Sequence, residues 1–278
     1  MDKETYTYIS KKITELKKKY KKVISNIVYD KMREMEIDKE ICCEKGFVLV
    51  TKDEFVSRVL FCATDIETLQ WLLKQIPNGH MIEYLYKEKY DLADCLSQAG
   101  FTKFATYIRR TEVYEKNPYK IPEIGKRKIL EKRYDPSCGE YAQKEDIPEL
   151  IKLHEEIFCV YGDDFFTYEQ WEKIIENREC LVYKVNGIIM SYFVWKIQGK
   201  KFYTNIIVNR MPANISYNME RRIREEAWDS GIHCFYNWIE EKNVASITRR
   251  NDNPEYEKNI IRQDILYNDI WIKKKGDD

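Results

Sequence analysis

Apolar residues recur along this chain with two different periods, and together these periods predict an α/β fold with a mixed sheet. Apolar positions three and four residues apart in the Lys-rich start predict a helical segment over residues 1–45. Between residues 46 and 120 the pattern predicts the order β-β-α-β-α-β. From residue 139 onward it predicts β-α-α-β-β-β-α-β-α-β, with a terminal strand over 265–272.

Short local signals mark several boundaries of these elements. Asp65 and Thr167 each stand where a helix N-cap is expected, and Gln170 follows Thr167 at capping-box spacing. Asn186-Gly187 lies between two β-rich runs and is the strongest signal for a two-residue hairpin turn. The sequence therefore predicts two helix starts and one central hairpin.

Proline and glycine residues interrupt the middle of the chain and indicate a connector. We expect a helical segment over 1–45, a first domain over 46–120, a connector over 121–138 and a second domain over 139–278. At 278 residues the chain is long enough for two modest domains or one large one.

The charge balance argues against a nucleic-acid partner. Lys plus Arg and Asp plus Glu are equal at 47 each, so the chain has no net basic field. The lysine run Lys17–Lys19 is typical of the solvated face of a helix, and phosphate contact is the alternative.

Cysteine usage and hydropathy favour a cytoplasmic protein that does not enter a membrane. No run of about 18 apolar residues occurs, and the N-terminus lacks the apolar region of a secretory signal. The eight cysteines are scattered without a C-x-x-C pair, which is typical of reduced core thiols. With only three histidines and no Cys/His spacing pattern, we expect no metal site.

Other candidate chemistry is sparse. The sequence contains no G-x-S-x-G, P-loop or H-E-x-x-H pattern, which excludes several hydrolase and nucleotide-binding classes. His154 has no Ser or Cys near it in sequence and is interpreted as structural. Aromatic residues on the central strands favour cross-strand packing, and a pocket wall for an apolar substrate is the alternative: Tyr183, Tyr192, Trp195, Phe202, Tyr203, Tyr236 and Trp238.

Three stretches of the second domain carry a family resemblance. They are Tyr141-Ala-Gln-Lys-Glu-Asp-Ile-Pro, the hairpin Leu181-Val-Tyr-Lys-Val-Asn-Gly-Ile, and Gly231-Ile-His-Cys-Phe-Tyr-Asn-Trp-Ile followed by Asn243-Val-Ala-Ser246. With the element order, over roughly residues 139–260, they resemble the GNAT superfamily of CoA-dependent acyltransferases. The resemblance implies a GNAT-like fold and acetyl-CoA or another acyl-CoA as co-substrate.

The first domain resembles a shortened copy of the same unit. Its elements from Phe55 to Tyr114 are similar to the second half of the family fold, and Gln98-Ala-Gly-Phe101 resembles the Gly-Phe after the last helix. The expectation is two tandem GNAT-like units, and an unrelated α/β cap on one acyltransferase domain is the alternative.

The resemblance implies a cofactor site where a strand runs into a helix. The matching stretch runs from Ile206 to Arg222, with Asn214 at the family's Gln/Arg position and Tyr217 and Met219 replacing its glycines. An ordinary strand–loop–helix connection is the alternative. The expected cofactor contacts are Ile207, Val208, Arg210, Asn214, Ser216, Tyr217, Asn218, Asn243 and Ser246.

The residue that would protonate the CoA thiolate departs from the family pattern. Arg250 stands at the usual place of the family's tyrosine, so Tyr256, further along, is the catalytic candidate. Glu240 and Glu241 are candidate bases, and Asn243 is also suited to capping a helix.

The function that the resemblance implies is a CoA-dependent N-acyltransferase acting on a small amine or amino-acid-like substrate. The alternative is a catalytically inactive GNAT-like module that binds a metabolite, peptide or protein. A third possibility is transfer from another activated donor, such as aminoacyl-tRNA or an acyl carrier protein.

Overall fold

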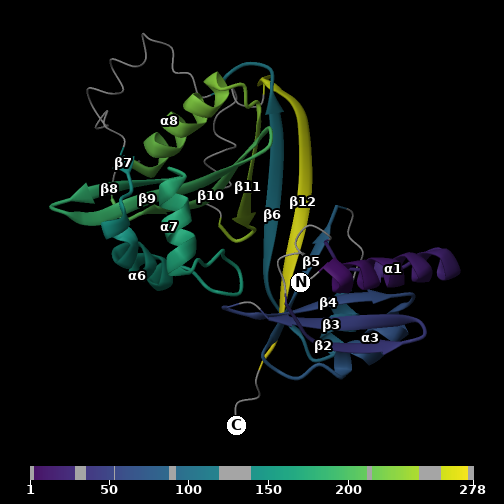
Figure 1. The fold of residues 1–278 in the computed structure, drawn as a ribbon. Coiled ribbons are helices and arrows are strands. Elements are labelled where there is room, and N and C mark those ends of the chain that lie inside the picture. The colour runs from purple at the N-terminus through teal and green to yellow at the C-terminus, as the bar shows by residue number, and fades with distance from the viewer. Residues whose placement is uncertain are drawn as a thin grey trace. The chain divides into compact units, whose positions relative to one another are not determined.

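The computed structural model describes residues 3–28, 36–52, 54–87, 92–118, 139–211, 215–243 and 258–274 (Figure 1). The chain divides into two compact units. Unit 1 comprises Met1–Tyr107, Val160–Gly162 and Leu266–Asp278, and unit 2 comprises Ile108–Cys159 and Asp163–Ile265. These units differ from the expected domains because the last residues of the chain belong to unit 1.

Unit 1 is a sheet with helices on both faces. Its elements are α1 Lys3–Tyr20, β1 Ile24–Ser25, β2 Glu36–Cys43, β3 Gly46–Lys52, β4 Ser57–Ala63, α3 Ile66–Lys74, β5 His80–Tyr86, α4 Ala93–Gln98 and the first part of β6 Thr102–Tyr114. The strand order is β2-β3-β4-β5-β12-β6, in which β12 (Ile260–Lys273) contributes its last residues.

Alternating side chains of β3 and β4 supply two apolar layers. Val48 and Phe61 face the helix α3, whose Leu69 and Leu72 are fully buried. Phe47 and Leu49 face the opposite side, where α1 packs with Ile9, Ile13 and Leu16. Because both faces of the sheet are covered, the sequence of β3 is a continuous apolar run and does not alternate between apolar and polar residues.

The expectation of a helical segment over residues 1–45 is wrong for the described residues beyond Tyr20. The helix α1 ends there, and Lys21 adopts a positive φ of 62°. Ile24 and Ile27 continue the apolar spacing of the helix. However, β1 pairs with β4 and β2 pairs with β3, so long-range strand pairing outweighs that local spacing.

Unit 2 contains the second set of predicted elements in the expected order. After the end of β6 these are β7 Glu140–Tyr141, the 3-10 turn Lys144–Asp146, α6 Ile147–Ile157, α7 Tyr168–Glu176, β8 Cys180–Val185, β9 Ile188–Gln198, β10 Lys201–Asn209, α8 Ile215–Asp229, β11 Cys234–Glu240 and the first part of β12. The strand order is β6-β11-β10-β9-β8-β7. The helix expected after β11 falls largely outside the described residues, and β12 begins earlier than predicted.

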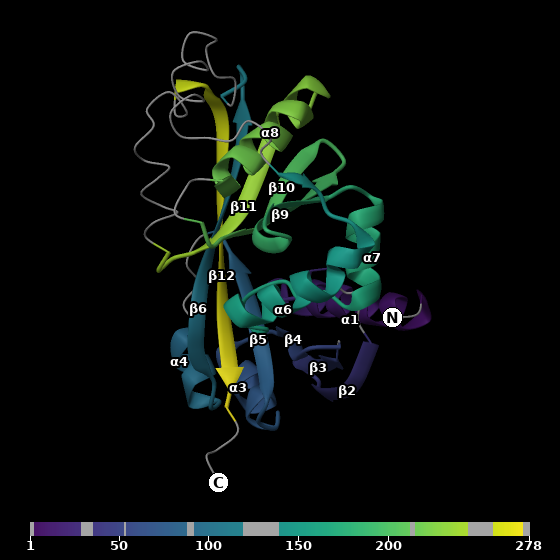
Figure 2. The same cartoon turned by 90° about the vertical axis from the view of Figure 1, so that its left-hand side faces the viewer.

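Two apolar clusters cover the opposite faces of this part of the sheet. Phe202 and Phe235 pack with Met219 and Ile223 of α8 on one face. Ile206, Val208 and Tyr192 pack with the helices α6 and α7 on the other. Figure 2 shows strands β9 and β10 between α8 and the α6–α7 pair.

The local signals of the sequence are confirmed. Asp65 accepts a hydrogen bond from the Thr68 amide, and Thr167 forms a capping box with Gln170. Asn186 and Gly187 have φ values of 53° and 81°, as a type I′ hairpin turn requires.

Candidate functional site

Strands β10 and β11 are parallel and pair only over their first residues. The pairs run from Lys201–Cys234 to Thr204–Asn237, and a bulge lies between Thr204 and Ile206 in the register with β9. A bulge bends and twists its strand, so β10 turns away from β11 at this point. We call residues 205–209 of β10 and 238–240 of β11 the strand opening of unit 2.

The edge of β10 that lines this opening has no strand neighbour among the residues described. β9 covers the other edge, and the pairs with β11 end at Thr204. Main-chain N–H and C=O groups are strong hydrogen-bonding groups that need partners. This edge is therefore suited to pairing with amide groups of an extended ligand.

The helix α8 is the next element after β10, and Met211, just past the strand, packs in the same apolar cluster as Ile215 at the helix start. The first N–H groups of a helix lack intrahelical partners and carry a partial positive charge, which favours anions. Ser216 and Asn218 are both buried at this helix start. The Asn218 amide nitrogen has no hydrogen-bond partner within the described structure, so it is a candidate donor to a ligand.

The two residues that replace the family's glycines behave differently. Met219 is fully buried in the core beneath α8, and its side chain lies against Gly139. Tyr217 is half-buried at the same helix start. Met219 is therefore a core residue, and only Tyr217 bears on access to the helix start.

The other described cofactor candidates lie around this junction. Val208 is buried against α6 and α7, whereas Ile207 is 39% exposed. Arg210 forms an ion pair with Glu156 of α6 at 2.5 Å, which lowers the pKa of Glu156. Both side chains are exposed, so a phosphate could compete for Arg210 at small cost.

The remaining candidates are separated from this group or fall outside it. Asn243 is exposed after β11, and its amide donates to the Glu240 carbonyl at 2.9 Å. Asn214, Ser246 and Tyr256 lie outside the described residues. The structure thus brings Ser216, Tyr217 and Asn218 to the end of β10, and the roles of all nine candidates and of Tyr256 stay predictions.

A polar cluster lies on the α6–α7 face of β10 and β11. The sequence interpretation named its residues Tyr203, Tyr236 and Glu240, but it missed the arginine and the two aspartates that join them. The rings of Tyr203 and Tyr236 stack at 4.7 Å and 5°, immediately before the strands part. The Tyr203 hydroxyl donates to Asp164 at 3.4 Å, and the Tyr236 hydroxyl donates to Gln198 at 2.6 Å. Burial raises the pKa of Tyr203 well above its usual value, so this phenol stays protonated.

Carboxylates and one arginine complete this cluster. Burial raises the pKa of Asp163, and the charges of Asp164 and Glu240 raise it further. The Arg109 guanidinium lies 5.6 Å from the Tyr236 ring centre and 5.5 Å from that of Trp238. Arg109 belongs to β6, so only the tertiary fold brings it to these strands.

His154 fixes the loop that carries these aspartates. Its Nε2 contacts the Asp164 carbonyl at 2.9 Å and its Nδ1 contacts the Tyr192 hydroxyl at 2.8 Å. A carbonyl can only accept, so Nε2 carries the proton and Nδ1 accepts from Tyr192. Burial lowers the pKa of His154 to about 4, so the ring is neutral at pH 7, and the structural interpretation of this residue stays a prediction.

The described residues show neither a metal-binding cluster nor a membrane-spanning helix. They contain no group of three or more His, Cys, Asp or Glu side chains placed to hold a metal ion. None of the helices that the structure describes is long and apolar enough to cross a membrane.

The parting strands β10 and β11, with α8 between them in the chain, belong to a fold that solved GNAT acetyltransferases share. The structure is similar to a GCN5-related N-acetyltransferase from Sphaerobacter thermophilus, with a TM-score of 0.50, 12% identity, and coverage of 84% of this chain and 78% of that one. It is also similar to a GCN5-related N-acetyltransferase from Kribbella flavida (TM-score 0.49, 10% identity, 85% and 90% covered). A GNAT-family acetyltransferase from Colwellia psychrerythraea is a further neighbour (TM-score 0.46, 11% identity, 89% and 99% covered). No family model and no curated protein matches the sequence.

Proposed function

We propose that this chain is an acyl-CoA-dependent N-acyltransferase with its reaction site at the strand opening of unit 2. The observation that carries the proposal is the end of the β10–β11 pairing at Thr204 and Asn237, with α8 as the next element after β10. The exposed strand edge suits the amides of pantetheine, and the helix start suits a pyrophosphate. Acetyl-CoA or another acyl-CoA would supply the acyl thioester.

The acceptor in this proposal is a small amine or amino-acid-like molecule that approaches from the α6–α7 face. Asp163, Asp164 and Glu240 place negative charge there, which attracts an ammonium group. Asp163 has a raised pKa and is suited to accepting the proton that the amine releases. Tyr256 remains the proposed donor of a proton to the CoA thiolate.

Calorimetric titration with acetyl-CoA tests the proposal. We expect saturable binding by the wild type and at least about tenfold weaker binding by Asn218→Asp, because a carboxylate at the helix start repels phosphate. Asp229→Asn, at the other end of α8, is the matched control and should bind like the wild type. Thermal melts establish that each variant is folded. Absence of binding by the wild type at millimolar acetyl-CoA would refute the proposal.

A catalytically inactive GNAT-like binding module is the second candidate. It is favoured by the glycine-free stretch from Ile206 to Arg222 and by the half-buried Tyr217 at the helix start. Under this function Tyr217→Gly would raise the affinity for CoA, while the wild type would acylate none of a panel of amines. Measured turnover by the wild type would exclude it.

We also propose that the protein works in the cytoplasm. The described cysteines are all free, and burial raises the pKa of Cys62 and of Cys95 to about 11 each, which keeps these thiols protonated. Mass measurement of the protein purified without reductant tests this proposal, and disulfide bonds in that protein would contradict it.

A further inference from the structure

Unit 1 contains a second pair of parallel strands that part. β4 and β5 flank the helix α3, just as β10 and β11 flank α8. They pair only at Ser57–His80 and Arg58–Met81. We call residues 59–63 of β4 and 82–86 of β5 the strand opening of unit 1.

The chain itself lies in this opening. β1 pairs with the end of β4 through Ile24–Ala63 and Ser25–Cys62, on the edge that β5 has left. The Ser25 hydroxyl donates to the Phe61 carbonyl at 2.9 Å, and the main-chain N–H of Asn26 donates to the same oxygen at 3.3 Å. Residues 24–26 therefore take the place that a paired strand or an extended ligand would take.

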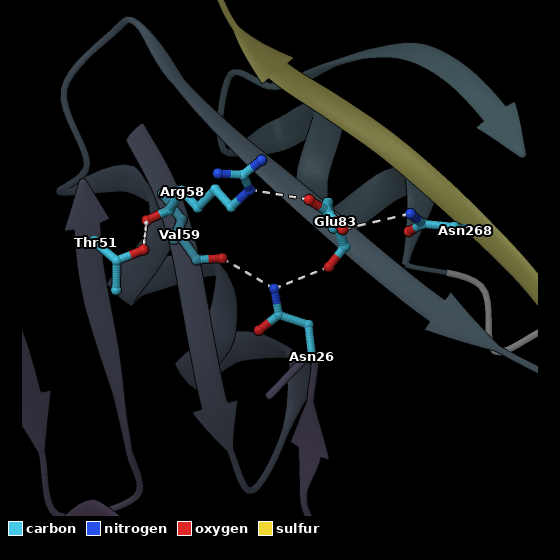
Figure 3. A network of polar contacts seen from close by, with 6 residues as sticks. All are labelled: Asn26, Thr51, Arg58, Val59, Glu83 and Asn268. Carbon is cyan, nitrogen blue, oxygen red and sulfur yellow. Dashed lines mark hydrogen bonds and ion pairs between the residues drawn. The ribbon is translucent and has the colours of Figure 1, made fainter. Parts of the chain in front are cut away.

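Asn26 bridges the two strands with its carboxamide (Figure 3). Its Nδ2 donates to the Val59 carbonyl at 2.9 Å and to the Glu83 carbonyl at 3.0 Å. Its Oδ1 accepts from the Phe61 amide at 2.7 Å. The side chain is buried, and both protons of Nδ2 are used.

A side-chain ion pair also joins the two strands beside Asn26. Arg58 on β4 contacts Glu83 on β5 at 3.0 Å, and both side chains are largely buried. The other carboxylate oxygen of Glu83 accepts from Asn268 of β12 at 3.5 Å. Arg58, Glu83 and the Asn26 carboxamide are thus engaged within unit 1, whereas the buried Asn268 Oδ1 has no hydrogen-bond partner among the described residues.

The N-terminus of α3, which follows β4, is also capped by a side chain of the protein. Asp65 caps α3, and hydrogen bonds with Thr68 lower the pKa of Asp65 to about 2. Only Thr64 and Asp65 separate β4 from α3, so this carboxylate stands at the helix start. A negative charge there disfavours a phosphate, in contrast to α8, whose first turn carries no acidic residue.

We infer that the strand opening of unit 1 is an amide-binding site that the chain fills with its own Asn26. Of the two openings described, that of unit 2 alone is then available to a ligand. The identity of the ligand in unit 2, an amide-bearing thioester, rests on the proposed function. The role of Asn26 does not depend on it.

Amide hydrogen exchange at Phe61 tests the occupied opening without any ligand. We expect slow exchange in the wild type, because this amide donates to Asn26, and exchange about tenfold faster in Asn26→Ala. The amides of the β3–β4 pairs serve as internal controls and should stay protected in both proteins. Exchange of Phe61 in the wild type at the rate of an unstructured residue would overturn the inference, whether or not the variant folds.

Binding stoichiometry separates this inference from the proposed function. We expect one acetyl-CoA per wild-type chain in equilibrium dialysis. Two bound molecules per chain would overturn the inference and leave the proposed function standing. No bound acetyl-CoA, together with a protected Phe61 amide, would refute the proposed function and still support the filled opening of unit 1.

Discussion

Two buried asparagines distinguish the strand openings at the scale of single residues. In unit 1 both ends of the Asn26 carboxamide are hydrogen-bonded to β4 and β5. In unit 2 the Asn218 amide nitrogen has no partner in the described part of the chain. A buried donor without an acceptor costs about 1–3 kcal/mol, so a ligand that accepts from Asn218 would recover that energy.

His154 makes stability depend on pH. Its folded pKa of about 4 lies below the ordinary value of 6.5, so the unfolded chain binds the proton first as pH falls. Stability is therefore full above pH 6.5, and on the order of 3 kcal/mol is lost between pH 6.5 and 4. Urea unfolding of the wild type and His154→Gln measures this, because the variant should lack that part of the pH dependence. An NMR titration of the His154 ring giving a pKa near 6.5 would contradict the prediction.

Elements form where local chemistry and long-range packing agree. The capped helices α3 and α7 and the hairpin β8–β9 have explicit start or turn residues, and they form where those residues indicate. The segment after α1 has the same apolar spacing as the helix, yet it becomes β1 because β4 offers an unpaired edge. Tertiary pairing thus overrides local periodicity where no cap marks a boundary.

The hairpin turn supplies a prediction at this scale. Gly187→Ala should destabilise the protein by about 1 kcal/mol, because Gly187 has a φ of 81° that alanine adopts poorly. The added methyl group would meet nothing within 4 Å, so the cost comes from the backbone alone. Asn186→Gly is the control and should be neutral or mildly stabilising, because φ is positive there too. Chemical unfolding measures both; an unchanged midpoint for Gly187→Ala would show that the turn conformation is wrong.

The whole molecule depends on two long strands that each contribute to both units. β6 passes from unit 1 into unit 2, and β12 returns from unit 2 into unit 1. Residues Tyr267–Lys273 of β12 pair with β5 along its full length. A division of the sequence near residue 120 therefore separates unit 1 from one of its own strands.

This connectivity predicts how separated halves behave. Residues 1–118 produced alone should fail to fold cooperatively, because β5 loses its pairs with β12 and the amide of Gly79 loses the Lys273 carbonyl. Co-expression with residues 139–278 should restore a complex with the circular dichroism of the intact chain. A cooperative thermal transition of the isolated first half would contradict the prediction.

Much of the candidate site follows from patterns that the sequence displays. The strand β10, the helix α8 and their junction could be predicted from the sequence, because the spacing of apolar residues and the turn residues are local signals. The association of Arg109 and Asp163 with Tyr203 and Tyr236 could not be predicted, because these residues come from separate elements. No spacing rule connects residues that meet only when strands pair.

By itself the sequence determined the class of fold and the order of most elements, because propensity, capping and period act between near neighbours. The tertiary structure alone decided which strand opening is filled. Asn26 lies more than 30 residues from Val59 and Phe61, and only strand pairing brings its carboxamide to them. It also decided that residues 266–278 belong to unit 1, because hydrogen bonds between strands do not depend on distance along the chain.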